Sequence, residues 1–200
     1  IDYDALALSE ERNWVRGAVS CLAPEHRHCM IALSDGGTDA AYWREFDTHT
    51  KQFVENGFML PEAKSRVSWI DADTLLIGTD TGPDSLTTSG YARTLRIWPR
   101  GADYREAPAF VEGEARDVAV WPNVDQDGAT AHIFALQAVS FFETIFHYAA
   151  GKDAAPQALP LPRRANLEGV LDGLAIFRLR EDWSHGGRDY PQGSGVAYDL

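Results

Sequence analysis

Short runs of apolar and β-branched residues alternate with turns rich in Gly, Asp, Pro and Thr from Trp14 to the end of the chain. Runs of this length and composition, bounded by turn residues, predict β-strands. The first group of expected strands covers residues 14–24, 28–34 and 42–47, with a short fourth strand at 52–54. Pro61 and Glu62 are expected in the crossing to the next group, and residues 4–13 form either a short helix or an irregular lead-in.

Three further groups repeat the same order of strands and turns. The second has expected strands at 66–71, 74–80, 94–101 and 108–113; the third at 115–122, 131–139, 143–151 and 157–162; the fourth at 166–173, 174–182 and 195–200. One position tests the repeat, namely the aromatic residue that closes the third strand of each group. Phe46, Trp98, Tyr148 and Tyr198 occupy this position at intervals of 52, 50 and 50 residues.

A period of about 50 residues, with four short strands per unit and no long helix, is typical of β-propeller blades. We therefore predict an all-β fold of about four consecutive four-stranded blades at residues 14–60, 61–113, 114–163 and 164–200. They form a partial propeller domain over residues 1–200, an incomplete ring. The alternative is a β-sandwich with regular turns, but a sandwich does not require such even spacing.

In a propeller, the loops that join second to third strands share one face, and function is usually located there. These loops are expected at Asp35–Ala41, Thr79–Ala92, Val139–Glu143 and Asp182–Gly195. Two of them are long and rich in glycine, which is uncommon in compact domains unless the loop has a function or moves. The arginines expected nearest this face or the central channel are Arg16, Arg44, Arg93 and Arg116. The tryptophans are expected mainly in core packing between blades.

Composition narrows the function classes. The chain has 200 residues, 44% of them hydrophobic, which is enough for a substantial core. Its formal net charge is -12, which argues against nucleic-acid binding because phosphate contact needs a basic face. There is neither an apolar run of membrane-spanning length nor a signal-peptide pattern, so no membrane partner is expected. Because the chain begins at Ile1 and stops inside an expected strand, we expect a piece of a longer protein, cytoplasmic or alternatively periplasmic.

The cysteines and the metal-binding residue types give no strong signal. Cys21 and Cys29 flank one turn and could form a disulfide across a hairpin, but two free buried thiols are the favoured interpretation. His26 and His28 share that turn without a third ligand at zinc-like spacing. The aspartate pairs Asp71 with Asp73 and Asp80 with Asp84 are explained by turn formation. We therefore expect no metal and no cofactor.

The chain also shows no catalytic nucleophile motif. A nucleophile elbow needs G-x-S-x-G at a turn from strand to helix, because small neighbours let the serine sit in a strained bend. The nearest match is Gly193-Ser194-Gly195, which has Gln192 and Val196 at the outer glycine positions. This segment is expected to be an ordinary turn.

The loops and the strands beside them carry a family resemblance. It rests on Ser34, Gly37, Thr38 and Asp39; on Glu45, Phe46 and Asp47; on Trp69, Asp71 and Asp73; and on Gly78–Asp80 with Ser89–Tyr91. With these residues the chain resembles the amino-terminal β-propeller of the prolyl oligopeptidase family of serine peptidases, especially its bacterial post-proline-cleaving branch. The resemblance is specific in the first half and weaker from Val111 to Leu174.

The resemblance implies a seven-bladed propeller placed over an α/β-hydrolase domain with a Ser, Asp and His triad, which cleaves short peptides after proline. That domain is absent from this chain, so we expect a noncatalytic gating and docking fragment. Its partners would be the hydrolase domain of the same protein and a short peptide substrate. The residues expected to shape substrate access or the domain contact are Asp35, Gly37, Thr38, Asp39, Thr79, Asp80, Ser89, Tyr91 and Arg93.

An incomplete ring and a shared loop face lead to two further expectations. An open first or last blade exposes apolar faces and a strand edge, so the isolated chain is expected to self-associate. The alternative function is a nonenzymatic scaffold that binds a protein or a glycan through the same loop face. The gene sequence beyond Leu200 distinguishes the two functions, because only the peptidase needs a G-x-S-x-G motif there.

Overall fold

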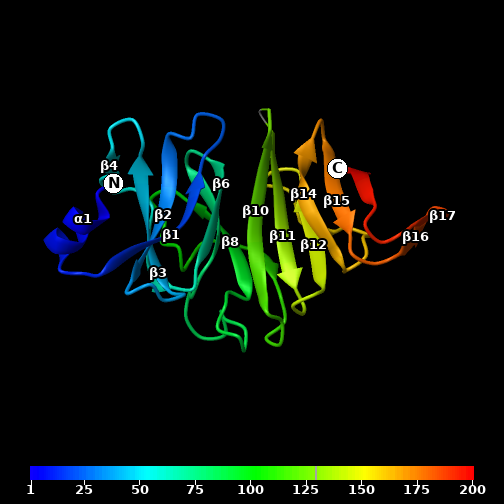
Figure 1. The fold of residues 1–200 in the computed structure, drawn as a ribbon, viewed down its shortest axis with the longest axis horizontal. Coiled ribbons are helices and arrows are strands. Elements are labelled where there is room, and N and C mark those ends of the chain that lie inside the picture. The colour runs from blue at the N-terminus through cyan, green and yellow to red at the C-terminus, as the bar shows by residue number, and fades with distance from the viewer. Residues whose placement is uncertain (129) are drawn as a thin grey trace.

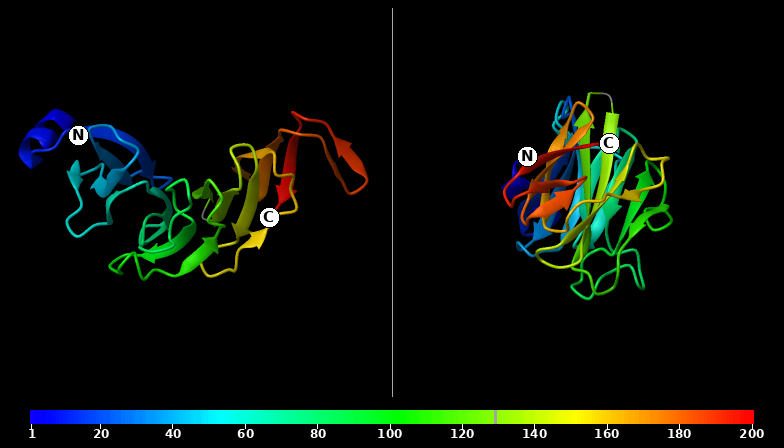
Figure 2. Two further views of the ribbon diagram at one scale, coloured as in Figure 1. Left: turned by 90° about the horizontal axis from the view of Figure 1, so that it is seen from below. Right: turned by 90° about the vertical axis from the view of Figure 1, so that its right-hand side faces the viewer.

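The computed structural model describes residues 1–128 and 130–200. It confirms the predicted fold class: four antiparallel sheets follow one another along an arc, with one short helix at the amino-terminal end (Figures 1 and 2). The helix, α1 (Tyr3–Glu10), begins where Asp2 accepts a hydrogen bond from the Ala5 N–H and ends where Glu11 adopts a left-handed conformation. None of its side chains is buried, so it adds little to the core.

The first sheet contains five strands, β1 (Trp14–Cys21), β2 (His28–Asp35), β3 (Ala41–Asp47), β4 (Gln52–Phe53) and β5 (Met59–Ala63). One assignment from the sequence was wrong here: Pro61 and Glu62 belong to β5 and not to a simple crossing. Strand β5 pairs with β3 beyond the short β4, because β4 covers only the last two residues of β3 and leaves the rest of that edge free.

The second and third sheets each have four strands in chain order. The second contains β6 (Arg66–Asp71), β7 (Thr74–Gly78), β8 (Thr94–Pro99) and β9 (Ala109–Glu112). The third contains β10 (Ala119–Asp127), β11 (Thr130–Ala138), β12 (Thr144–Ala149) and β13 (Gln157–Ala158). The first strands of neighbouring sheets contact each other, on the inner side of the arc (Figure 2).

The fourth sheet has three strands, β14 (Ala165–Leu171), β15 (Leu174–Leu179) and β18 (Gly195–Asp199). The segment Asp182–Gly195 was predicted as a plain loop, and this is wrong in part. It contains a two-stranded hairpin of β16 (Trp183–His185) and β17 (Arg188–Tyr190), which projects from the end of the arc (Figure 2). Rings of Trp183 and Tyr190, with centroids 5.5 Å apart, explain why this Gly-rich segment pairs with itself.

The core lies between the sheets. Between the first two sheets, the Phe58 ring packs edge-on against Trp69 and Trp98, at centroid distances of 5.6 and 4.8 Å. All three side chains are buried, as core packing of the tryptophans predicts. A second cluster fills the space between the second and third sheets, and a third fills the space between the third and fourth. Each blade therefore depends on its neighbour for burial of its apolar face.

A buried carboxylate also joins the first two blades. Glu45 on β3 accepts two hydrogen bonds from Arg100 of the second blade, at 2.7 and 3.1 Å, one from the Phe58 N–H at 2.9 Å, and lies 2.9 Å from His28 Nδ1. Burial alone would raise the pKa of Glu45, but the hydrogen bonds from Arg100 and the Phe58 N–H outweigh it and hold that pKa below its usual value. Glu45 therefore stays ionised in the core as a link between blades.

The cysteines form a disulfide, so the favoured interpretation of two free thiols was wrong. Cys21 closes β1 and lies directly opposite Cys29 near the start of β2, so the strand register brings the two sulfur atoms together. The turn between them is also fixed by hydrogen bonds from the Leu22 N–H to the His28 carbonyl and from the His26 N–H to the Leu22 carbonyl. The disulfide therefore further stabilises a turn that backbone hydrogen bonds already close.

Candidate functional site

The loops that join second to third strands in the first three blades lie at one end of the sheets, the lower edge in Figure 1. We call this surface the loop face. The β2–β3 loop spans residues 36–40, the β7–β8 loop 79–93 and the β11–β12 loop 139–143. The hairpin of the fourth blade points sideways, away from the arc (Figure 2).

The first loop is braced against the segment that comes after the helix. Asp35 accepts hydrogen bonds from Arg12 Nη1 and from the Asn13 N–H, each at 3.0 Å, and the arginine contact lowers the pKa of this aspartate. Gly37 has a φ of 81°, a left-handed conformation that favours glycine. Thr38 accepts a 2.9 Å bond at its carbonyl from Ser34 Oγ, whereas the exposed Asp39 lies 3.8 Å from Lys64 Nζ. Gly37, Thr38 and Asp39 are all exposed, so these three predicted residues are accessible for outside contact.

The long second loop folds back on itself and docks on the third blade. Asp80 Oδ1 accepts hydrogen bonds from the Gly82 N–H and Ser85 Oγ, and Thr79 is buried with its hydroxyl 2.6 Å from Ser65 Oγ. Thr87 Oγ1 donates to the Val118 carbonyl at 2.9 Å. Thr79 and Asp80 therefore stabilise the loop, and the predicted residues exposed on it are Asp80 and Ser89.

Tyr91 and Arg93 lie where this loop returns to the sheet. The Tyr91 ring packs edge-on against Trp121 with centroids 5.1 Å apart, and Lys64 Nζ lies 4.8 Å from the centre of the Tyr91 ring. Arg93 pairs with Glu112 at 2.7 Å, so its charge is balanced inside its own blade. Tyr91 thus marks the edge of an aromatic cluster, while Arg93 has a structural ion pair.

Beside Tyr91, a cavity of about 450 Å³ opens between the third and fourth blades. Its aromatic lining consists of Tyr91, Trp121, Phe141 and Phe146. A smaller cavity of about 190 Å³ adjoins it and is lined by Phe141, Phe142, Arg164, Asn166, Arg180 and Gln192. Phe141 and Asn166 belong to both linings, so the two cavities form one continuous surface at the loop face.

Sequence reasoning missed Phe141, Phe142, Arg164 and Arg180. The two phenylalanines are 86% and 78% exposed at the tip of the β11–β12 turn, although residues of this type are usually buried. The available signal was the pair of adjacent phenylalanines inside an expected turn. The two arginines could not be found this way, because the sheet of the fourth blade brings them together.

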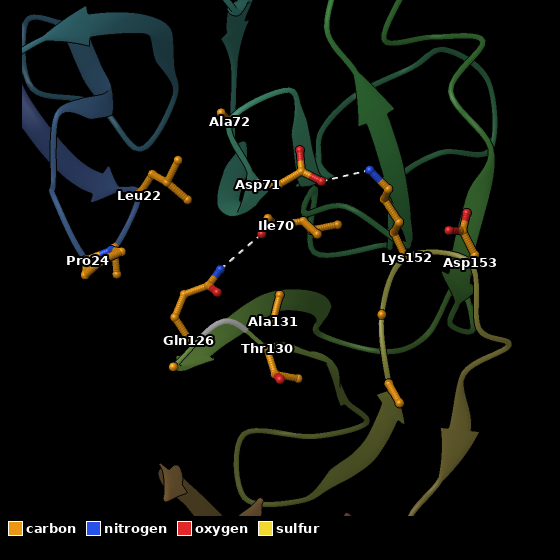
Figure 3. A pocket seen from close by; sticks show the side chains of 14 residues that line it. Leu22, Pro24, Ile70, Asp71, Ala72, Gln126, Thr130, Ala131, Lys152 and Asp153 are labelled. Atoms are coloured by element: carbon orange, nitrogen blue, oxygen red, sulfur yellow. Dashed lines mark hydrogen bonds and ion pairs between the residues drawn. The ribbon is translucent and has the colours of Figure 1, made fainter. Parts of the chain in front are cut away.

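A third cavity, of about 600 Å³, is lined in part by residues 22–24, 70–72 and 150–153, at the end of the sheets opposite the loop face in Figure 1. Figure 3 shows this cavity from close by. Lys152 Nζ crosses from the third blade to Asp71 Oδ2 of the second at 2.8 Å, and Gln126 donates to the Ile70 carbonyl at 3.1 Å (Figure 3). Asp71 also accepts the N–H of Asp73, as predicted for a turn. Burial would raise the pKa of Asp71, but the hydrogen bond from Lys152 and those from Thr74 and the Asp73 N–H hold it down. Lys152, Asp71 and Gln126 therefore link the second and third blades.

One hairpin brings together a serine, a histidine and an aspartate, but not in the arrangement of a catalytic triad. Ser184, His185 and Asp189 share the projecting hairpin, but Ser184 Oγ donates directly to Asp189 and the His185 ring stacks on Trp183. The serine thus lacks the histidine contact that would activate it. Within residues 1–128 and 130–200, no group of three or more His, Cys, Asp or Glu side chains is arranged to hold a metal ion. The same residues include no helix of the length and apolarity needed to cross a membrane.

Comparison with known proteins gives the family. Residues 2–170 match the family model described as the prolyl oligopeptidase N-terminal β-propeller domain. The chain belongs to the prolyl oligopeptidase family. It is 36% identical over its whole length to an uncharacterized peptidase of Sinorhizobium fredii, covering 28% of that protein. It is 28% identical over 98% of its length to an uncharacterized peptidase of Rickettsia prowazekii, covering 29% of it.

Solved structures agree with this family and fold. A post-proline cleaving enzyme from Rickettsia typhi superimposes with a TM-score of 0.90 and 26% identity, over 100% of this chain and 30% of that one. Oligopeptidase B from Leishmania major superimposes with a TM-score of 0.64 over 94% of this chain and 25% of its own, and at 14% identity it supports the fold alone. The chain therefore spans under a third of the length of these relatives. The part that it matches is the amino-terminal β-propeller domain of the family.

Proposed function

We propose that the chain is the access-controlling propeller region of a serine peptidase that hydrolyses short peptides after proline. In this proposal its loop face docks on the α/β-hydrolase domain of the same protein. The observation that carries it is the similarity, along the whole chain, to an enzyme named as post-proline cleaving. The family match supports the peptidase class, and the rest of the proposal concerns substrate and mode of action.

The loop face has the properties that a gate between substrate and active site needs. Its long loop is docked by the Thr88 N–H on the Ala115 carbonyl at 2.8 Å, so neighbouring blades hold it in place. Exposed groups of different character remain free to meet a partner, including Asp39, Ser89 and Phe141. A rigid face with a few protruding side chains can limit the size of a peptide that passes while its own fold stays unchanged.

In the whole protein, a serine activated by histidine would attack the peptide carbonyl in a site that these residues only border. The geometry of the hairpin supports this, because Ser184 Oγ donates to Asp189 and not to the neighbouring His185. We therefore propose that the chain is noncatalytic and acts on the reaction by selecting which peptides reach it.

The test uses a chromogenic peptide with proline before the scissile bond and a matched peptide with alanine in that position. We expect the whole protein to cleave the proline peptide and to lose activity with a serine-directed reagent, and the 200-residue chain to cleave neither. Cleavage by the chain alone, blocked by that reagent, would overturn its noncatalytic role. Equal cleavage of both peptides by the whole protein would overturn the proline specificity. A gene that lacks G-x-S-x-G after Leu200 would instead support a scaffold.

We also propose that the isolated chain self-associates. The fourth sheet has three strands where the second and third have four, so one edge of β18 is unpaired in the described structure. Val15 and Val19 are exposed on β1, and Leu171 is exposed in the turn region of the fourth blade. Open strand edges and apolar faces favour pairing between chains. Sedimentation velocity should show association that increases with concentration, and a purely monomeric profile at high concentration would contradict this.

A further inference from the structure

The Phe141–Phe142 turn holds two apolar rings in solvent by its own hydrogen bonds. The Val139 N–H donates to the Glu143 carbonyl at 3.0 Å, and the Phe142 N–H donates to Ser140 Oγ at 3.2 Å. The Thr144 N–H donates to the Arg163 carbonyl at 2.8 Å, which ties the turn to the fourth blade. Because these hydrogen bonds fix the backbone of the turn, the two rings are held in an exposed position. Adjacent exposed aromatic side chains on a fixed turn indicate a contact surface.

Two arginines face each other beside these rings. The Arg180 N–H donates to the Arg164 carbonyl at 2.7 Å, directly next to the paired residues Ala165 and Leu179. Residues opposite each other in an antiparallel pair project to the same side of the sheet, where like charges destabilise each other. Both side chains are exposed, so water screens part of this repulsion, and an anion between the two guanidinium groups would relieve the rest.

Two carboxylates of the chain lie near this pair, but neither makes a short contact with a guanidinium group. Arg164 Nε is 3.9 Å from Glu143 Oε1, a long contact, and Glu181 accepts the backbone N–H of Arg164 and not its guanidinium group. Arg180 takes part in no ion pair within the described residues.

The residues around Arg164 and Arg180 indicate which kind of anion fits between them. Arg164 and Arg180 line the smaller cavity with the amides of Asn166 and Gln192, and the rings of Phe141 and Phe142 form its wall. A carboxylate suits two guanidinium groups because it can accept several charge-assisted hydrogen bonds at once. The adjoining aromatic cavity, with Trp121 and Phe146, has room for an apolar side chain attached to that carboxylate.

We propose that this pair of cavities binds the free carboxylate end of a short peptide whose last residue is apolar. Arg164 and Arg180 hold the carboxylate, and the aromatic cavity beside Phe141 takes the last side chain. The inference deepens the proposed function and rests on it, because a peptidase acting on short peptides meets free carboxyl ends near its active site. It adds a means of measuring peptide length from the carboxyl end.

The test is direct binding to the 200-residue chain, measured by calorimetry and by tryptophan fluorescence, since Trp121 lines the aromatic cavity. The probes are the tripeptide Gly-Ala-Phe with a free carboxyl end and the same peptide with a carboxamide end. We expect the free acid to bind at least about tenfold more tightly, because hydrogen bonds to charged groups contribute roughly tenfold or more in affinity. Equal binding of acid and amide, or binding of neither, would overturn the proposal.

Variants separate the two parts of the site. Arg180→Gln should reduce acid binding about tenfold while leaving amide binding unchanged, and Phe141→Ala with Phe142→Ala should weaken both peptides. The control is Arg188→Gln, which removes the same charge from the exposed hairpin outside the cavity and should change neither. If Arg188→Gln weakens binding as much as Arg180→Gln does, the effect is general electrostatics and the assigned site is wrong.

The outcome is independent of the activity test of the whole protein. A whole protein that cleaves after proline, with a chain that does not distinguish acid from amide, would refute this inference and leave the proposed function standing. A chain that binds the acid selectively, in a protein that does not cleave after proline, would refute the proposed specificity and leave the carboxylate site standing.

Discussion

Replacing Glu45 by glutamine should strongly destabilise the chain, because it removes one partner of a buried ion pair between blades. The Glu45 side chain is fully buried, and its carboxylate accepts hydrogen bonds from three groups: Arg100, the Phe58 N–H and His28. Breaking a buried pair on one side typically costs about 3–5 kcal/mol. Arg100 is 30% exposed and keeps Asp73 and the Ala72 carbonyl as partners, so we expect the lower end, about 3 kcal/mol.

The assay is urea unfolding followed by tryptophan fluorescence. With a slope of about 2–3 kcal/mol per molar urea for a chain of this size, the midpoint of Glu45→Gln should fall by roughly 1 M or more. The matched control is Glu168→Gln, which removes a carboxylate from the exposed pair with Arg178. Exposed pairs contribute little, so this midpoint should barely move.

The pH dependence gives an independent check. Because the pKa of Glu45 is lowered in the folded chain, its carboxylate stabilises the fold above the ordinary value of 4.5, and this stabilisation is lost as the pH falls towards the folded pKa. The difference between the natural chain and Glu45→Gln should therefore shrink on acidification. A Glu45→Gln midpoint equal to that of Glu168→Gln at neutral pH would refute the buried link between blades.

Three further predictions concern the rest of the fold. Replacing Cys21 and Cys29 with alanine should lower stability by about 2.5 kcal/mol from lost closure of an eight-residue loop, measured by urea unfolding. A thiol count on the protein from its own cells should find no free thiol. Two free thiols would contradict the disulfide and would indicate a reducing compartment such as the cytoplasm. Gly78→Ala should cost about 1–3 kcal/mol, because the added carbon would lie 2.8 Å from Leu95, whereas Gly195→Ala meets nothing within 4 Å and should be neutral. Burial lowers the pKa of His147, so stability should fall as the pH drops below about 6.5, and His147→Gln should flatten that dependence in thermal unfolding.

The strand pattern, the 50-residue period and the family could be predicted from the sequence alone, because each rests on local composition. Alternation of apolar and polar residues and the position of turn residues determine where strands begin and end. Aromatic residues repeat at the same position in each blade because each blade has the same order of strands to pack. These residues are Phe46, Trp98, Tyr148 and Tyr198. The family motifs lie in the loops and in the strands beside them, and they can be recognised without knowing what packs against them.

The tertiary structure alone decided which residues meet. The disulfide depends on the register that places Cys21 opposite Cys29, and the buried link joins Glu45 to Arg100 across two blades. Arg164 and Arg180 become neighbours only when β14 pairs with β15. Register and packing between sheets depend on contacts between segments distant in the chain, and no local pattern records them. For this reason the sequence could not show which predicted loop residues bond within the chain, or that Arg164 and Arg180 lie beside Phe141 and Phe142. The role of the predicted loop residues stays a prediction.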